Sequence, residues 1–402
     1  MRTPKLNWPW VREKLFFILP PLCLAIFLSM WASWIIAKSA YAPRSGHPIG
    51  PDFSYFWAAA SLVLGGEPAA VYDFSRIHAV EMAYFGVDLN VPWPYPPSYL
   101  LLLLPFGLLP YLPSLVIWLS TTLAGYLVII HRIAPNPRVV WFALVFPGAF
   151  QNLFFGQNGF LSSIFLGGGL LLLDRYPWLA GLLLSLLTYK PHLAVLVPLA
   201  LVAGRRWQAL LAMLAGTVAL ILATTLVLGP QVWTAFLNHI PKAMKILETG
   251  SLNLVHMMPT VFAAVQLSGA GVVSARILHT ATMLAVVGLV AWTWRRESPS
   301  PLRNAMLVLG ILMFSPHGYV YDLAILALPM AWLGWEGYTK GWLPGERVLL
   351  FLAWISPVAL IWLAQATGVQ LTPLVLMGLI FLVFRRALQG SPAPAWKMEI
   401  AV

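Results

Sequence analysis

Acidic side chains that could serve as a general base are scarce in this chain. Its 402 residues include 13 Asp and Glu and 8 His. Two of these acids, Asp52 and Asp73, lie near the ends of the stretch PDFSYFWAAASLVLGGEPAAVYD. A carboxylate held at a helix start above a cavity can accept a proton from a hydroxyl. Because Asp52 follows Gly50 and Pro51, its position is also typical of a helix N-cap, and the two roles are compatible.

A lysine stands between two short apolar segments, in the sequence TYKPH. An ammonium group at membrane depth costs about 2.5–3.5 kcal/mol, so Lys190 is expected to have an anionic partner such as a lipid-linked phosphate. Its neighbour His192 could hydrogen-bond the same phosphate. In the alternative interpretation, Lys190 only extends towards the membrane surface from a turn that Pro191 creates, and His192 is a passive surface group.

Two other polar turns carry groups that could contact a sugar. In FGQNG, the side-chain amides of Gln157 and Asn158 can donate hydrogen bonds to sugar hydroxyls or phosphate oxygens. The same turn could simply join two helices, because its glycines permit a tight bend. The segment SPHGYVYD places a histidine, an aromatic ring and a carboxylate close together. The candidate substrate-binding residues are therefore Tyr55, Asp73, Gln157, Asn158, Lys190, His192, His317, Tyr321 and Asp322.

Metal chemistry is not expected from these residues. His317 and Asp322 have no further His or carboxylate at ligand spacing, which argues against zinc. A magnesium or manganese site for a nucleotide-sugar would require a DxD-like cluster or a nucleotide-binding fingerprint, and GxGxxG and GxxxxGK[ST] are both absent. The single cysteine, Cys23, cannot form a disulfide framework. We expect no metal and no cofactor.

The composition shows what must position these residues. With 60% hydrophobic and 9% charged residues, the chain cannot form a soluble globule and is expected to be an all-α polytopic membrane protein. The net charge of +11 comes from Lys and Arg at the ends of apolar runs, which are topology signals and not a nucleic-acid surface. The apolar segments fall at about 15–36, 98–131, 139–153, 160–173, 178–189, 191–203, 208–228, 272–294, 303–315, 321–335, 347–366 and 370–385.

The distribution of Lys and Arg predicts an orientation. If the N-terminus is cytoplasmic and 98–131 crosses an odd number of times, most basic residues fall inside. Residues 37–97 and 229–271 are then extracytoplasmic loops, 387–402 is a cytoplasmic tail, and the polar turns share the outer face. In the alternative topology, 98–111 and 113–131 cross separately and 178–203 is one helix. The second loop contains an apparent amphipathic helix that could lie along the membrane surface.

The ordered segments DFSYFWAAASLVLGGEPAAVYD, GQNGFLSSIF and LAGLLLSLLTYKPHLAVLVPLALVAGRRW resemble glycosyltransferase family 87. PPSYLLLLLPFGLLP and SPHGYVYDLAILALP also resemble that family. The resemblance implies a single GT-C domain over 1–402, with about 11–13 transmembrane helices and amphipathic helices in its first outer loop. It implies transfer of a hexose, commonly mannose, from a polyprenyl-phosphate donor to a lipid or glycan acceptor, with Asp52 as the catalytic base.

The resemblance also implies a bacterial cytoplasmic membrane location with an outward-facing site. Here a single acid follows Pro51, where some GT-C enzymes carry adjacent acids. The role of Asp73 stays open between orienting the acceptor and bracing the loop, and bracing is favoured.

Transfer of a pentose such as arabinose, glycan-to-lipid ligation and lipid or glycan transport are the competing functions. A transporter would be expected to show paired halves with broken helices and deep charges, which this sequence lacks.

Overall fold

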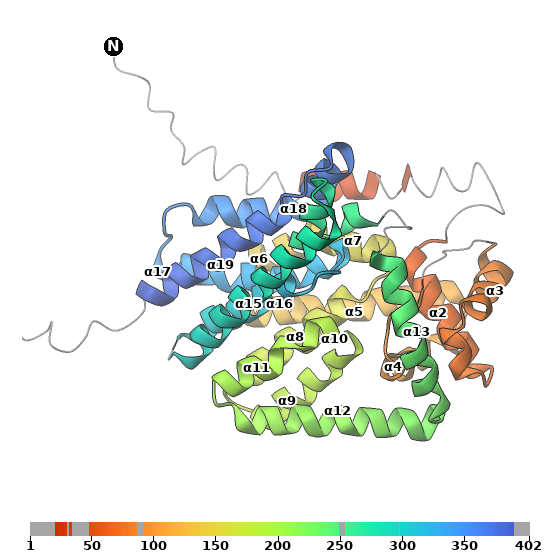
Figure 1. Ribbon diagram of the computed structural model, residues 1–402. Helices are drawn as coiled ribbons and strands as arrows, with labels where there is room; N and C mark the ends of the chain where they lie inside the picture. The colour runs from red at the N-terminus through yellow and green to blue at the C-terminus, as the bar shows by residue number, and fades with distance from the viewer. Residues whose placement is uncertain are drawn as a thin grey trace, which may run out of the picture.

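The computed structural model describes residues 21–29, 32–33, 48–86, 92–248, 254–296 and 298–389. Over these ranges the regular structure consists of α-helices and short 3-10 helices, without a strand (Figure 1). The predicted all-α polytopic membrane protein is therefore confirmed. Much of the predicted first apolar segment, much of the loop before residue 48 and residues 390–402 of the predicted tail lie outside the described residues.

The helices follow one another through short connections. Their bounds are α2 Pro51–Leu64, η1 Pro68–Tyr72, α3 Phe74–Phe85, α4 Pro97–Gly107, α5 Tyr111–Ile133, α6 Pro137–Leu144, α7 Pro147–Phe155, α8 Gly159–Leu172, α9 Pro177–Ser185, η2 Leu186–Tyr189, α10 Pro191–Ala194, α11 Leu196–Ala203, α12 Trp207–Leu228, α13 Gln231–Glu248, η3 Val255–Met257, α14 Val261–Leu267, α15 Gly271–Arg295, α16 Ser300–Phe314, η4 Val320–Leu326, α17 Ala327–Lys340, α18 Glu346–Thr367 and α19 Thr372–Gln389.

Five described helices, α5, α12, α15, α18 and α19, are long and apolar enough to cross a membrane. The bent pair α6 and α7 adds a sixth if it forms one span. Several other apolar helices run for only 10–17 residues, at most about 25 Å, and are too short to cross a hydrocarbon core of about 30 Å unaided. The predicted number of 11–13 transmembrane helices therefore stays a prediction.

Basic residues gather where several helix connections meet. Asp174 pairs with Arg206 at 2.7 Å and with Arg303 at 2.6 Å, which joins the α8–α9 and α11–α12 connections to the first turn of α16. Near them, the α19 residue Arg386 pairs with Glu346 at 2.5 Å, which joins the end of α19 to the start of α18. We call this side of the molecule, on the left in Figure 1, the basic end.

Short helices run from the basic end and stop before the opposite one. Helices α8, α9 with η2, α10 with α11, and α16 belong to this set. By contrast, α5, α12 and α15 have 23, 22 and 25 residues, which corresponds to about 33–38 Å. The ends of the short helices that are remote from the basic end meet inside the protein. They stop short of the ends of the long helices. This arrangement creates an interior position for polar groups.

Two features of the helices, the length of α4 and a break at Lys190, bear on the choice between the two predicted topologies. Helix α4 has 11 residues, about 16 Å, so within 98–131 only α5 is long enough to span. The segment 178–203 is not one helix, because the chain breaks at Lys190 between η2 and α10. The break at Lys190 disagrees with the single helix that the alternative requires, but neither 178–189 nor 191–203 is long enough to cross alone, as the first topology requires, so the topology stays a prediction.

The first loop packs tightly. Helix α2 was expected to be amphipathic, but ten of its 14 residues are buried on all sides of the helix. Its aromatic residues pack against α4 and α5, as in the ring contact of Phe53 with Trp118 at 5.9 Å. Helix α13 stands across the direction of α12 in Figure 1 and covers η1, where Phe236 contacts Tyr72 at 5.6 Å. The two outer loops of the prediction therefore pack against each other.

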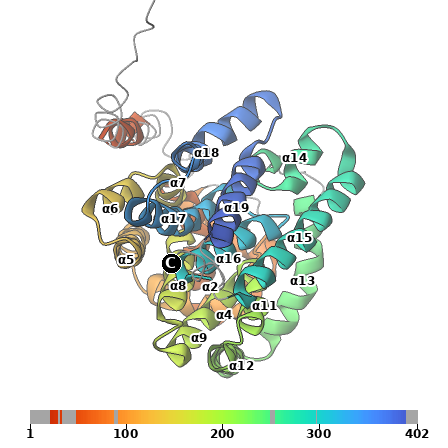
Figure 2. The same ribbon diagram turned by 90° about the vertical axis from the view of Figure 1, so that its left-hand side faces the viewer.

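Small residues position the helix that leads to Lys190. A Cβ atom on Gly181 of α9 would lie 2.2 Å from the carbonyl oxygen of Ala209 on α12, and one on Gly216 would lie 2.4 Å from the hydroxyl of Ser185. These glycines allow the two backbones to approach closely, as at many membrane helix interfaces. In Figure 2, α9 and α12 lie beside each other at one edge of the bundle.

Candidate active site

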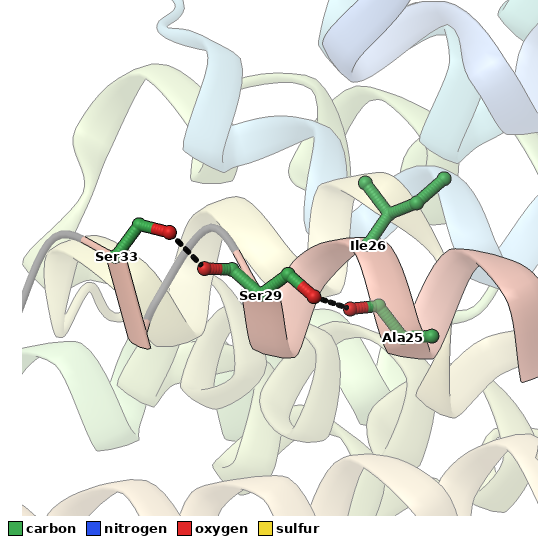
Figure 3. A pocket seen from close by; sticks show the side chains of 4 residues that line it. All are labelled: Ala25, Ile26, Ser29 and Ser33. Atoms are coloured by element: carbon green, nitrogen blue, oxygen red, sulfur yellow. Dashed lines mark hydrogen bonds between the residues drawn. The ribbon is translucent and has the colours of Figure 1, made fainter.

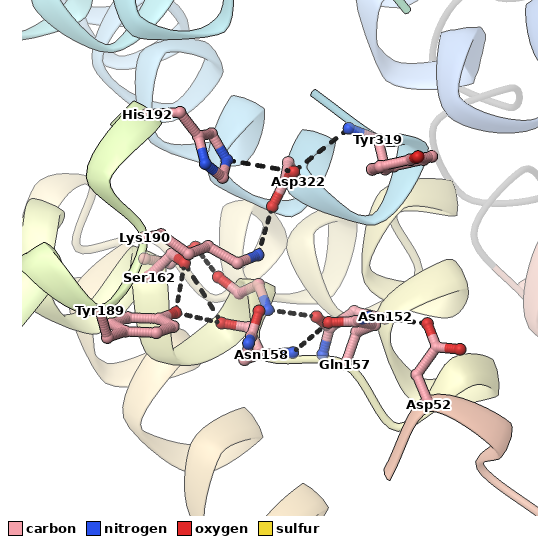
Figure 4. Close-up of polar contacts among 12 residues, drawn as sticks. Asp52, Asn152, Gln157, Asn158, Ser162, Tyr189, Lys190, His192, Tyr319 and Asp322 are labelled. Carbon is pink, nitrogen blue, oxygen red and sulfur yellow. Dashed lines mark hydrogen bonds and ion pairs between the residues drawn. The ribbon is translucent and has the colours of Figure 1, made fainter. Parts of the chain in front are cut away.

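Polar side chains from four distant segments meet at the tips of the short helices (Figure 4). They come from the start of α2, the α7–α8 turn, the break between η2 and α10, and the connection from α16 to η4. We call this set the polar cluster: Asp52, Asn152, Gln157, Asn158, Ser162, Tyr189, Lys190, His192, Tyr319 and Asp322. Six of the ten predicted site residues belong to it.

Asp52 is not the N-cap of its helix. Helix α2 begins at Pro51, and its N-cap is Gly50, whose φ of 68° is in the left-handed region that favours glycine. Asp52 therefore lies inside the first turn, and its side chain makes no capping bond. Its Oδ2 instead accepts a hydrogen bond of 2.6 Å from Nε2 of Gln157. The capping interpretation is wrong because glycine and proline already form the start of the helix.

The surroundings of Asp52 favour a proton acceptor near neutral pH. Burial raises the pKa of its carboxyl group from 3.8 to about 6, although the bond from Gln157 and the charge of Lys190 act in the opposite direction. The residue keeps part of its surface accessible. A carboxylate with this pKa is charged at pH 7 and binds a proton more readily than an ordinary aspartate.

Gln157 has a fixed orientation. Its Oε1 accepts a bond of 3.2 Å from the backbone N–H of Asn158, so its amide nitrogen is the group that faces Asp52. Asn158 is fully buried and donates from Nδ2 to the hydroxyl of Tyr99 at 3.1 Å. The sequence predicted both amides as substrate contacts. In this structure they position the carboxylate and the turn around it.

Gly159 allows the α7–α8 turn to lie against η4. Its N–H donates to Oδ1 of Asn152 at 2.6 Å, and an added Cβ would lie 2.6 Å from both that oxygen and the carbonyl oxygen of Tyr321. Because a carbonyl cannot move aside as a flexible side chain would, Gly159→Ala should destabilise the protein by about 1–3 kcal/mol. Thermal unfolding in detergent measures this loss.

Gly288→Ala in α15 is the matched control, because a Cβ there would have no neighbour within 4 Å. The control should melt at or slightly above the wild-type temperature, because alanine favours a helix more than glycine does. Equal melting temperatures for Gly159→Ala and the control would show that the turn has more room than the structure indicates.

A buried ion pair lies beside Asp52. Nζ of Lys190 is 2.5 Å from Oδ1 of Asp322, and the two residues are 2% and 4% exposed. The backbone N–H of Tyr319 donates to Oδ2 of Asp322 at 3.2 Å. Nε2 of His192 lies 3.7 Å from the same oxygen, which is too far for a hydrogen bond, and has no hydrogen-bond partner among the described residues. Lys190 thus has the anionic partner that the sequence required, and it is a protein carboxylate.

Aromatic residues form one wall of the cluster. Tyr99 contacts Tyr95 at 4.7 Å and Tyr189 at 4.8 Å, and the hydroxyl of Tyr189 lies 2.7 Å from that of Ser162. Sequence reasoning missed these tyrosines. The aromatic stretch VPWPYPPSY and the Tyr that precedes Lys190 were the available signals. Nζ of Lys190 also lies 5.3 Å from the ring centre of Tyr321, a cation–π distance.

Three of the predicted substrate-binding residues lie outside the polar cluster. Asp73 caps α3 and accepts from the N–H and the hydroxyl of Ser75 at 2.9 and 2.7 Å. These bonds lower the pKa of its exposed carboxyl group, in the bracing role that the sequence favoured. Tyr55 is buried with its ring 5.1 Å from that of Trp93. His317 packs 5.3 Å from the ring of Phe262.

A surface hollow near the N-terminal part of the described chain does not belong to the cluster. It is lined by Ala25, Ile26, Ser29 and Ser33 (Figure 3). The serine hydroxyls donate to the carbonyl oxygens of residues 25 and 29, so they satisfy their own helix. Within the described ranges, no group of three His, Cys, Asp or Glu could hold a metal ion. Metal independence stays a prediction.

The helical membrane fold with a buried acid and a buried ion pair is compatible with a membrane transferase. Residues 93–316 match the model of glycosyltransferase family 87, which is more than half of the 402 residues. The chain belongs to glycosyltransferase family 87 and is a membrane glycosyltransferase. No curated protein and no solved structure matches it. Because Asp52 precedes the matched residues and Asp322 follows them, their roles depend on the geometry of the cluster.

Proposed function

We propose that the protein transfers a hexose, with mannose as the first candidate, from a polyprenyl-phosphate donor to a lipid or glycan hydroxyl. The observation that carries this proposal is the position of Asp52. Its partly accessible carboxylate is held by Gln157 within the electrostatic reach of the buried Lys190. A base and a cation on one site are the two groups that displacement of a phosphate from a sugar requires.

The reaction is a single displacement. The acceptor oxygen forms a bond to the anomeric carbon as the bond from that carbon to the phosphate oxygen breaks. Asp52 takes the proton of the hydroxyl, and the lipid phosphate leaves with the bonding electron pair. One carboxylate suffices for this route, which inverts the anomeric configuration, whereas a retaining route through an enzyme nucleophile needs a second carboxylate about 5 Å away. Asp73, another acid of the same loop, is engaged with its own helix, and Glu67 pairs with Arg76.

The leaving phosphate requires donors. Lys190 supplies a positive charge that Asp322 keeps in place, and Nε2 of His192 has no hydrogen-bond partner among the described residues. We assign these two side chains to the phosphate, with Tyr321 and Asp322 shaping the same wall. The interior position of the cluster suits a donor whose phosphate enters from the membrane surface while its prenyl chain stays in the bilayer.

We place the site on the extracytoplasmic side of a bacterial cytoplasmic membrane. The support is the basic end, because cytoplasmic connections carry an excess of Lys and Arg. Gln157 and Asn158 of the polar cluster precede one end of α8, and Asp174, which pairs with Arg206 and Arg303, follows its other end. Protease accessibility of a tag inserted in the α2–η1 connection, measured in inverted and right-side-out vesicles, tests this orientation.

The pH dependence of transfer follows from Asp52. Because its pKa is about 6, the group is protonated below that pH and cannot act as a base. The rate should fall about tenfold per pH unit below pH 6 and level off above it. Gln157→Ala should move this acid limb to higher pH, because the lost hydrogen bond lowers the pKa in the wild type. An unmoved limb would limit Gln157 to a structural role.

A panel of donors tests the proposed reaction. Purified protein should transfer radiolabelled mannose from polyprenyl-phosphate-mannose to a membrane lipid extract in the presence of a chelator, and none from a nucleotide-linked mannose. Transfer from the nucleotide-sugar alone would overturn the donor assignment. Faster transfer from a polyprenyl-phosphate pentose would keep the mechanism and replace the sugar. Passage of lipid across vesicles without transfer would favour the transporter.

A further inference from the structure

A second hollow lies on the outside of the bundle, between α5 and α6, far along α5 from the polar cluster. Its apolar walls are formed by Leu127 and Val128 on α5 and by Val140, Trp141 and Leu144 on α6. His131 and Arg132 line the same hollow. We call this hollow the α5–α6 groove. It is separate from the site proposed for glycosyl transfer.

The groove has an ordered polarity. Helix α5 is a candidate membrane span, and His131 and Arg132 lie in its last turn, whereas Leu127 and Val128 lie one turn earlier. Helix α6 returns alongside α5 after Asn136, which accepts a hydrogen bond of 2.9 Å from the N–H of Arg138. A ligand that follows the groove would therefore meet basic groups at the helix end and apolar walls below them.

The basic groups of the groove have no counter-ion among the residues that the structure describes. Arg132 and His131 are exposed and form no ion pair or side-chain hydrogen bond with the described residues, and the groove lining contains no acid. Arg206, Arg303 and Arg386 of the basic end are paired with carboxylates, whereas Arg175 is exposed there and contacts only the ring of Tyr176, at 5.2 Å. An unpaired arginine above an apolar wall complements an amphiphile with an anionic head.

We propose that the α5–α6 groove binds one anionic phospholipid of the surrounding bilayer, with its phosphate at Arg132 and His131 and an acyl chain along Val128, Val140 and Leu144. The exposed Trp141 suits the boundary between head group and chain, where tryptophan is enriched. The order of charge and apolar surface and the place of the groove on a membrane span favour a lipid over a soluble anion or a protein.

Native mass spectrometry of the purified full-length protein tests the proposal. Protein in detergent is titrated with phosphatidylglycerol or phosphatidylcholine, and the fraction with one bound lipid is measured. One basic residue near an anionic head group strengthens binding about fivefold. The wild type should therefore prefer phosphatidylglycerol about fivefold, and Arg132→Gln should lose this preference. Val140→Trp, which fills the groove, should lose the bound lipid of either kind.

Arg175→Gln is the matched control, because Arg175 is exposed at the same end and lies outside the groove. It should bind phosphatidylglycerol as the wild type does. Equal losses in Arg175→Gln and Arg132→Gln, or unchanged binding by Arg132→Gln, would overturn the proposal in favour of general attraction to the basic end. Displacement of phosphatidylglycerol by an equimolar polyprenyl phosphate would also overturn it, by making the groove a carrier-lipid site.

Discussion

Asp52→Asn is expected to reduce sugar transfer about 10²–10⁴-fold, the range that a positioned general base contributes. The substitution conserves shape, and the amide oxygen can still accept the bond that Gln157 donates to the carboxylate in the wild type. It removes only the ability to take the acceptor proton. Initial rates with saturating donor and acceptor, at a pH two units above the acid limb, measure the loss.

Asp73→Asn is the matched control for that experiment. Both acids lie at the start of a helix in the same loop, but Asp73 is bonded to Ser75 and does not reach the polar cluster. Its variant should retain activity within a few-fold of the wild type. If Asp73→Asn lost as much activity as Asp52→Asn, or if Asp52→Asn were fully active, the base would have to be sought elsewhere, first at Asp322.

Lys190→Met has the second large expected effect. Removing one partner of a buried ion pair leaves an uncompensated charge and costs about 3–5 kcal/mol. Asp322, 4% exposed, would keep only the backbone N–H of Tyr319 and the more distant His192 around it. A marked fall in melting temperature should follow, together with loss of binding of the lipid phosphate. Thermal unfolding and titration with polyprenyl phosphate measure the two effects.

The double variant Lys190→Met with Asp322→Asn separates stability from binding. It replaces both charges with neutral groups, so most of the lost stability should return. Binding of polyprenyl phosphate should stay weak because the cation is still absent. Recovery of binding together with stability would contradict a direct role for Lys190 and leave it as a structural partner of Asp322.

The sequence predicted that the polar turns would gather on one side of the protein. In such an apolar chain, charged groups lie either at the turns or inside the helix bundle, away from lipid. Gln157, Lys190 and Asp322 were selected on that ground, and their segments converge. Their partners were not predictable. Lys190 and Asp322 are separated by 132 residues, so the pair forms only through the packing of short helices that no local pattern specifies.

Local rules were less reliable at the first loop. The sequence GPD before an apolar run is typical of an aspartate cap, yet the left-handed Gly50 shifts the helix start and frees the carboxylate of Asp52. Helix α2 was expected to have one solvent-exposed face, but aromatic residues and α4 bury it on all sides. Tyr99 and Tyr189 were overlooked because aromatic residues are frequent in membrane proteins and only tertiary contacts distinguish these two.

The structure of the Asp52→Asn variant with bound polyprenyl-phosphate-mannose would test directly whether Asp52 is the base of an inverting transfer. We expect the donor phosphate against Lys190 and His192, with the side chain of residue 52 on the opposite side of the anomeric carbon and room for an acceptor hydroxyl between that side chain and the carbon. A phosphate bound away from Lys190, or on the same side of that carbon as residue 52, would contradict an inverting transfer with Asp52 as its base.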